Sequence, residues 1–101
     1  MSRRRPRFQE CLKRLYGHCL LCQESRYEAL ECHRVVPGES GGTYREGNCV
    51  VLCASHHALV TAGSIRILCL RPASFASWVA QVQDDQGERW VPLTPSFLSQ
   101  V

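Results

Sequence analysis

Two pairs of residues with metal-ligand spacing lie in the middle of the chain. The first pair is Cys19-Leu-Leu-Cys22, and the second is Cys53-Ala-Ser-His56, with His57 directly after it. Two residues between ligands allow a tight turn to point both side chains at one ion, and two such turns complete the tetrahedral shell that zinc prefers. A closed Cys3His site leaves no coordination position for water, so we expect a structural Zn²⁺ whose binding energy is part of the folding energy.

Disulfide bonding is the alternative for paired cysteines, and the composition favours metal. The chain has seven cysteines, an odd number, and its first residues are basic and polar rather than those of a secretory signal. In a reducing compartment, cysteines at this spacing bind metal more often than they oxidise. We therefore expect a cytoplasmic protein whose paired cysteines hold zinc.

Positive charge is concentrated at the amino terminus, although the net charge of +3 is small. Arg3, Arg4 and Arg5 belong to a basic arm over residues 1–7, and Lys13 with Arg14 follow. Such a cluster suits contact with DNA phosphates, and a solubilising tail is the equally open alternative. No apolar stretch approaches the ~20 residues that a bilayer requires, so we expect no membrane partner.

The metal-ligand pairs must be positioned by a small fold, because 101 residues provide one domain with a single modest core. Phe8, Cys11, Leu12 and Leu15 recur at helical spacing, which predicts a helix over residues 8–16 that ends at Gly17. The core over residues 17–63 then reads as a strand at 26–36, a turn-rich loop at 37–42, a strand at 48–52 and a helix from 54 to 62.

The remaining residues, 64–101, predict a β-rich extension. Strands are expected at 64–70, 78–82 and 89–93, with a hairpin turn at 84–87 and an extended carboxyl end; a helix over 75–82 is the competing interpretation. We expect Trp78 and Trp90 in the core of this sheet, and Cys11, Cys49 and Cys69 as small core residues. The predicted class is α+β: a zinc-stapled ββα domain with an amino-terminal helix and a carboxyl-terminal β-extension.

The region from about Gly17 to Gly63 resembles the HNH, or ββα-metal, endonucleases, specifically the branch with zinc knuckles around the motif. The segments that carry the resemblance are Cys-Leu-Leu-Cys, then Glu-Cys-His-Arg-Val-Val-Pro-Gly with Gly-Gly-Thr-Tyr behind it, and finally Asn-Cys-Val-Val-Leu-Cys-Ala-Ser-His-His-Ala-Leu-Val. The resemblance implies a metal-dependent endonuclease that hydrolyses DNA phosphodiester bonds, with nicking as one mode. Because phages, mobile elements and host defence use such small nucleases, we expect a bacterial or phage-encoded protein.

The resemblance also assigns roles to three residues. His33 corresponds to the histidine at the end of the first strand, Asn48 to the asparagine that opens the second, and His57 to the histidine on the helix. His33 would be the general base, since an imidazole titrates near neutral pH. His57 would bind a catalytic Mg²⁺, Mn²⁺ or Ni²⁺ ion, and Asn48 would orient the loop.

The strand register around His33 has two interpretations. Counted back from Pro37, His33 falls at the family's metal-binding place and Arg34 at the place of the base. A shift by one residue makes Cys32 the ligand and His33 the base, and such a shift also exchanges the faces of the strand. The resemblance therefore implies His57 as a ligand of the catalytic ion, with His33 or Cys32 as the candidate for a second ligand.

Two further classes of function compete with the nuclease. A zinc-stabilised DNA-binding module with a decayed site is favoured by Arg34 at the place of the base, and a zinc-knuckle scaffold for protein contacts is the third interpretation. Arg34 and Arg45 are candidates for phosphate contact beside the basic arm. The sequence leaves the recognised DNA and the oligomeric state open.

Overall fold

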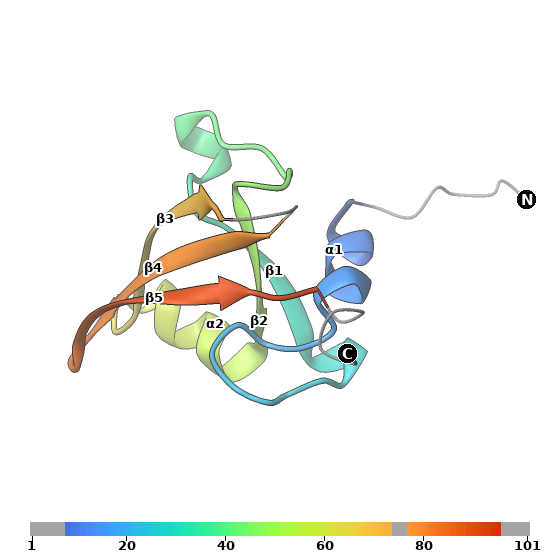
Figure 1. The fold of residues 1–101 in the computed structure, drawn as a ribbon, viewed down its shortest axis with the longest axis horizontal. Coiled ribbons are helices and arrows are strands. Elements are labelled where there is room, and N and C mark those ends of the chain that lie inside the picture. The colour runs from blue at the N-terminus through green and yellow to red at the C-terminus, as the bar shows by residue number, and fades with distance from the viewer. Residues whose placement is uncertain (1–7, 74–76, 96–101) are drawn as a thin grey trace, which may run out of the picture.

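The computed structural model describes residues 8–73 and 77–95 and confirms an α+β fold with two helices and two antiparallel sheets in these ranges (Figure 1). The basic arm at 1–7, with Arg3, Arg4 and Arg5, lies outside them. The elements in chain order are α1 Phe8–Tyr16, β1 Leu30–Arg34, β2 Cys49–Cys53, α2 Ala54–Thr61, β3 Arg66–Pro72, β4 Trp78–Asp84 and β5 Gly87–Leu93. Two short 3₁₀ turns occur at Tyr27–Ala29 and Gly38–Ser40.

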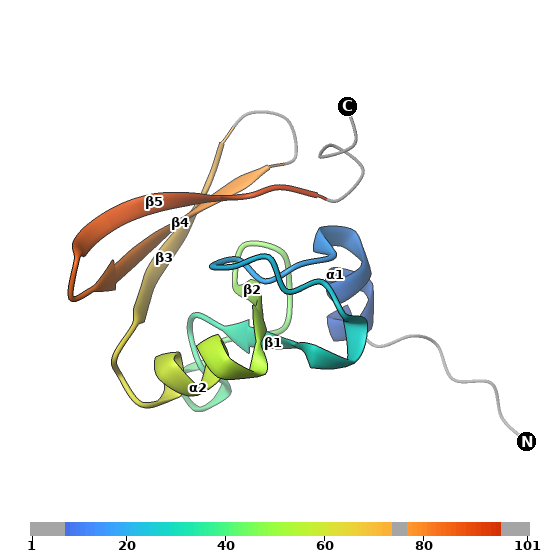
Figure 2. The same ribbon diagram turned by 90° about the horizontal axis from the view of Figure 1, so that it is seen from below.

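Strands β1 and β2 form an antiparallel pair that runs into helix α2. His33 pairs with Val50, and Leu30 pairs with Cys53, the last residue before α2. Helices α1 and α2 lie on opposite sides of this pair (Figure 2). Because successive side chains of a strand point to opposite faces, β1 presents alternate residues to the two helices.

Strand β2 is the centre of the core. All five of its residues, Cys-Val-Val-Leu-Cys, are buried, which explains why they form a continuous apolar run without polar alternation. Leu12 and Tyr16 of α1 cover β2 from one side, and residues of the second sheet complete the cluster. A two-stranded sheet is marginal alone, so β1–β2 depends on these layers and on the zinc-ligand turns.

The second sheet has the strand order β3-β4-β5 and is formed by the carboxyl-terminal part of the chain (Figure 1). Ile67, Ala80, Val82 and Leu93 point from it into the shared core. The predicted hairpin turn is confirmed: Asp84 pairs with Gly87, whose φ of 107° suits the left-handed conformation that glycine adopts readily. The competing helix over 75–82 is wrong from Trp78 onward, where β4 begins, and residues 74–76 lie outside the described part.

Three expectations need correction. The first core strand is shorter than 26–36, because β1 extends only as far as the five residues of β2 can pair with it. Trp90 is 46% exposed and packs under the Arg71 guanidinium on the outer face of the sheet, since its neighbours Val91 and Leu93 take the inward positions. Cys11 is exposed on α1 rather than in the core.

Neither helix in the described ranges combines the length and apolar character that crossing a membrane requires.

Candidate metal centre and candidate active site

The four predicted zinc ligands come together in one cluster. The donor atoms of Cys19, Cys22, Cys53 and His56 all lie within 4.8 Å of one another. The sulfur atoms of Cys22 and Cys53 are 3.8 Å apart, and Nδ1 of His56 lies 3.7 Å from the Cys19 sulfur. Tetrahedral zinc with Zn–S bonds near 2.3 Å would separate two sulfur ligands by ~3.8 Å. The cluster is therefore compatible with a structural metal such as zinc.

Backbone hydrogen bonds hold the ligand turns in place. The backbone NH of Leu21 donates to the Cys19 sulfur, and the NH of Leu20 donates to the carbonyl of Val51 in β2. At the second turn, the NH of His56 donates to the sulfur of Cys53, which thereby caps the amino terminus of α2. These bonds attach both turns to β2 and favour the thiolate forms that bind zinc.

The pKa values of Cys19 and Cys53 differ because their surroundings differ. Burial raises the pKa of Cys19 to about 11. Burial also opposes ionisation of Cys53, but hydrogen bonds from the His56 backbone and from neighbouring side chains outweigh it and lower the pKa to about 7. At neutral pH the Cys19 thiol therefore keeps its proton until a metal ion displaces it.

We expect the affinity for zinc to fall as pH falls, because protons compete with zinc for the sulfur atoms. The Cys19 thiol must release its proton at any pH well below about 11, so proton release accompanies zinc binding at neutral pH. Zinc release measured with a chromogenic chelator between pH 8 and pH 5 should become steadily more complete. His57→Ala should show the same profile, and a pH-independent zinc affinity would contradict the thiolate ligands.

His33 and His57 form a second group of polar side chains, between β1 and α2. Their ring centroids are 5.4 Å apart in an edge-to-face arrangement. Burial lowers the pKa of His33, and repulsion from His57 adds to this effect. A neutral imidazole with a free nitrogen can accept a proton from water, so the position of His33 suits a base.

Glu31 is a member of this group that the sequence analysis did not single out. Its carboxylate lies 2.6 Å from Nδ1 of His57, on the same face of β1 as His33. A proton on Nδ1 donated to Glu31 leaves the Nε2 lone pair of His57 for a cation. The sequence could have indicated Glu31, because the two-residue period of a strand places Glu31 and His33 on one face.

Cys32 points away from this group. Its thiol donates to the backbone carbonyl of Gln9 in α1, at 3.3 Å. The alternation along β1 thus turns Glu31 and His33 toward α2 and Cys32 toward α1. The geometry favours His33 over Cys32 as the side chain that meets His57.

Asn48 ties together the loop between β1 and β2. It is only 4% exposed, its Oδ1 accepts from the NH of Val36, and its Nδ2 donates to the carbonyls of Val36 and Thr43. A Cβ atom built at Gly42 would lie 1.6 Å from the carbonyl oxygen of Val36, so this crossing of the loop requires glycine. These bonds hold the chain that follows His33 in a fixed path.

A pocket adjoins the two histidines, and we call it the histidine pocket. It has a volume of about 210 Å³ and is lined by Cys32, His33, Arg34, Pro37, Tyr44 and His57. Arg34 therefore lines the same pocket as both imidazoles, although the alternation of β1 places it on the same face as Cys32, whereas Arg45 is exposed on the loop before Asn48. The sequence analysis missed Tyr44 as a pocket residue, because no local pattern brings it to β1.

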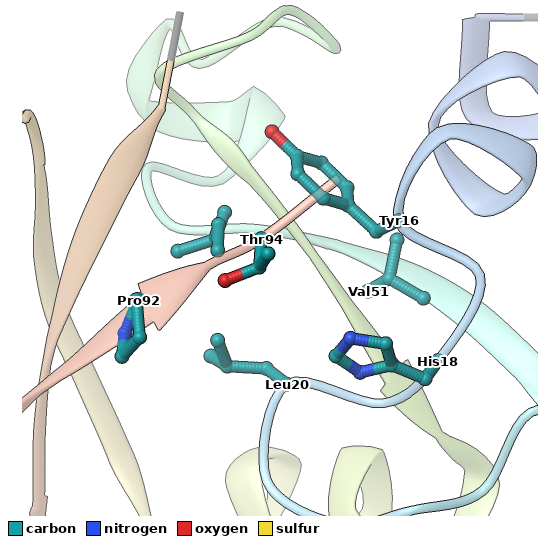
Figure 3. Close-up of a pocket in the computed structure, with 7 residues that line it drawn as sticks. Tyr16, His18, Leu20, Val51, Pro92 and Thr94 are labelled. Carbon is teal, nitrogen blue, oxygen red and sulfur yellow. The ribbon is translucent and has the colours of Figure 1, made fainter. Parts of the chain in front are cut away.

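A second pocket lies between the first zinc-ligand turn and the end of β5. His18, Leu20, Tyr16, Val51, Pro92 and Thr94 converge on it (Figure 3). Its volume of about 10 Å³ is close to that of one water molecule, so it is a packing gap and not a ligand site. His18 donates from Nδ1 to the Cys19 carbonyl and takes no part in the metal cluster.

Comparisons of the chain with protein-family models, with curated proteins and with solved structures found no significant match.

Proposed function

We propose that this protein is a metal-dependent endonuclease of the HNH type that hydrolyses DNA phosphodiester bonds. The proposal depends chiefly on one observation: the ring centroids of His33 and His57 lie 5.4 Å apart beside a pocket. His33 lies on β1 and His57 on α2, and these elements belong to a continuous strand, loop, strand and helix unit. The zinc-compatible cluster at the start of α2 supports it, because the cluster fixes the helix that carries His57.

In the proposed reaction, His33 removes a proton from a water molecule. The water oxygen attacks phosphorus, the P–O3′ bond breaks, and the leaving oxygen takes up a proton to give 3′-hydroxyl and 5′-phosphate ends. A divalent cation, Mg²⁺, Mn²⁺ or Ni²⁺, would be held by Nε2 of His57 and would neutralise charge on the phosphate oxygens. Among residues 8–73 and 77–95 the zinc-compatible cluster alone groups three such donors, so the remaining ligands of that cation would be water and substrate phosphate.

Four other residues support His33 and His57. Asn48 keeps the loop after His33 in its path through its bonds to Val36 and Thr43. Glu31 fixes the ring orientation of His57. Arg34 and the exposed Arg45 supply positive charge for phosphates beside the cut.

Supercoiled plasmid provides the test of this function. We expect the zinc-loaded protein to nick plasmid when Mg²⁺, Mn²⁺ or Ni²⁺ is added, and His57→Ala to lose nicking under all three. Glu31→Gln removes the charge but keeps the shape of the His57 partner, so it should retain part of the activity. Tight DNA binding without cutting under any metal would instead favour the zinc-stabilised DNA-binding module.

A further inference from the structure

The histidine pocket has one wall that hydrolysis does not require. Tyr44 and Pro37 contribute an aromatic ring and an apolar ring to the lining that also contains the polar side chains of His33 and His57. Tyr44 is 37% exposed, although a tyrosine ring commonly packs against its own protein. An apolar surface next to the candidate site for a phosphate suggests a ligand that has both an apolar face and a phosphate group.

Arg34 is held in place beside this wall. Its guanidinium carbon lies 4.3 Å from the centre of the Tyr44 ring, which is a cation–π distance. On the other side, a Cβ atom built at Gly38 would lie 2.6 Å from an Arg34 terminal nitrogen, so the absence of a side chain at Gly38 makes room for the guanidinium. The Arg34 guanidinium thus lies between the Tyr44 ring and the backbone at Gly38.

The charge of Arg34 is not neutralised within the described part of the chain. No carboxylate among residues 8–73 and 77–95 forms an ion pair with it, since Glu24, Glu31 and Asp84 pair with other residues. A fixed guanidinium without a carboxylate partner is suited to a phosphate, which it can bind through two parallel hydrogen bonds.

We infer that the histidine pocket binds an unpaired nucleobase against Tyr44 while Arg34 holds the adjoining phosphate. Inside a duplex, both faces of a base are covered by its neighbours, so only an unpaired base can offer a face to Tyr44. The pocket volume of about 210 Å³ is below the ~300–1,000 Å³ of sites for drug-sized ligands, which suits one base with its sugar. The substrate class is therefore nucleic acid that is single-stranded or distorted at the cut. The inference rests on the proposed nuclease function, because it assigns a substrate to the same pocket.

The test measures binding of zinc-loaded protein to a fluorescent single strand, without added divalent metal so that no cleavage occurs. We expect Tyr44→Leu to weaken binding about tenfold, since stacking on an aromatic ring contributes substantially per base. Tyr44→Phe should bind as the wild type does, because it keeps the ring. Tyr27→Leu is the matched control: Tyr27 is also 37% exposed and lies under the Lys13 ammonium at 4.0 Å, but it does not line the pocket.

An abasic strand separates the base from the phosphate. Tyr44→Leu should lose much less affinity for the abasic strand than for the intact strand, because only the ring contact with Arg34 is then lost, whereas Arg34→Gln should weaken binding to both strands. Gly38→Ala, whose Cβ would crowd the guanidinium, should weaken binding to both strands in the same direction but by less, because Arg34 keeps its charge and can shift. Equal losses for Tyr44→Leu and Tyr27→Leu, or a Tyr44→Leu loss that is as large on the abasic strand as on the intact strand, would overturn the inference.

The failure of this inference can be distinguished from failure of the proposed function. Metal-dependent plasmid nicking together with strand binding that is unchanged in Tyr44→Leu would support the nuclease function and refute the base site. Tyr44-dependent base binding without nicking under any metal would support the base site and refute the nuclease. Thermal melting of each variant, with a midpoint near that of the wild type, excludes unfolding as the cause of a lost affinity.

Discussion

Cys53→Ser is expected to unfold the domain, whereas His57→Ala should leave it folded. Cys53 is the last residue of β2, pairs with Leu30, caps α2 and supplies one of the four metal donors. Structural zinc contributes roughly 10–16 kcal/mol in small zinc domains, which is as large as the ~5–15 kcal/mol net stability of a typical protein. Losing one thiolate therefore removes a large share of the stability of this fold. His57, which follows the ligand His56, interacts with the exposed Glu31 and is not part of the cluster.

Circular dichroism melting and elemental analysis measure this prediction. Wild type and His57→Ala should contain one zinc per chain and melt cooperatively, and Cys53→Ser should lose both properties. Cys69→Ser is the matched control, because Cys69 is a half-buried cysteine whose sulfur contacts Gln81 and not the cluster. Equal melting temperatures for wild type and Cys53→Ser would refute the zinc assignment.

His33→Ala should reduce the nicking rate by about 10²–10⁴-fold, the usual contribution of a positioned general base. The rate should also depend on pH through His33, because a base must be neutral to accept a proton. Activity is present above the His33 pKa and is lost as pH falls through it. Burial, and then repulsion from His57, hold this pKa below its ordinary value of 6.5, so the half-maximal rate should lie below pH 6.5.

Plasmid nicking from pH 5 to pH 8 at fixed metal concentration measures both effects. His18→Gln is the control, since His18 contacts the Cys19 carbonyl and lies apart from the histidine pocket. Zinc content should be determined at each pH, because acid would also release an ion held by the zinc-compatible cluster. A rate unchanged in His33→Ala would remove His33 from the role of base.

Local spacing was sufficient to predict the metal cluster and most of the elements. Two residues between ligands constrain the chain to a turn whatever the rest of the fold does, so Cys19, Cys22, Cys53 and His56 were found from the sequence. The fully apolar run of β2 and the helical spacing of α1 carry the same kind of short-range information. Strand ends were less accurate, because the end of β1 depends on the length of its partner.

The candidate active site needed the tertiary structure. The sequence allowed either Cys32 or His33 to meet His57, and only the pairing of β1 with β2 between the two helices turns His33 and Glu31 toward α2. Tyr44 reaches the histidine pocket for a similar reason, through the path of a loop that Asn48 holds. The sequence by itself determined which residues form the zinc-compatible site, and it determined the α+β class of the fold. The tertiary structure decided which side chains surround His57, because the face that a strand residue occupies is fixed by long-range pairing and not by its neighbours in the chain.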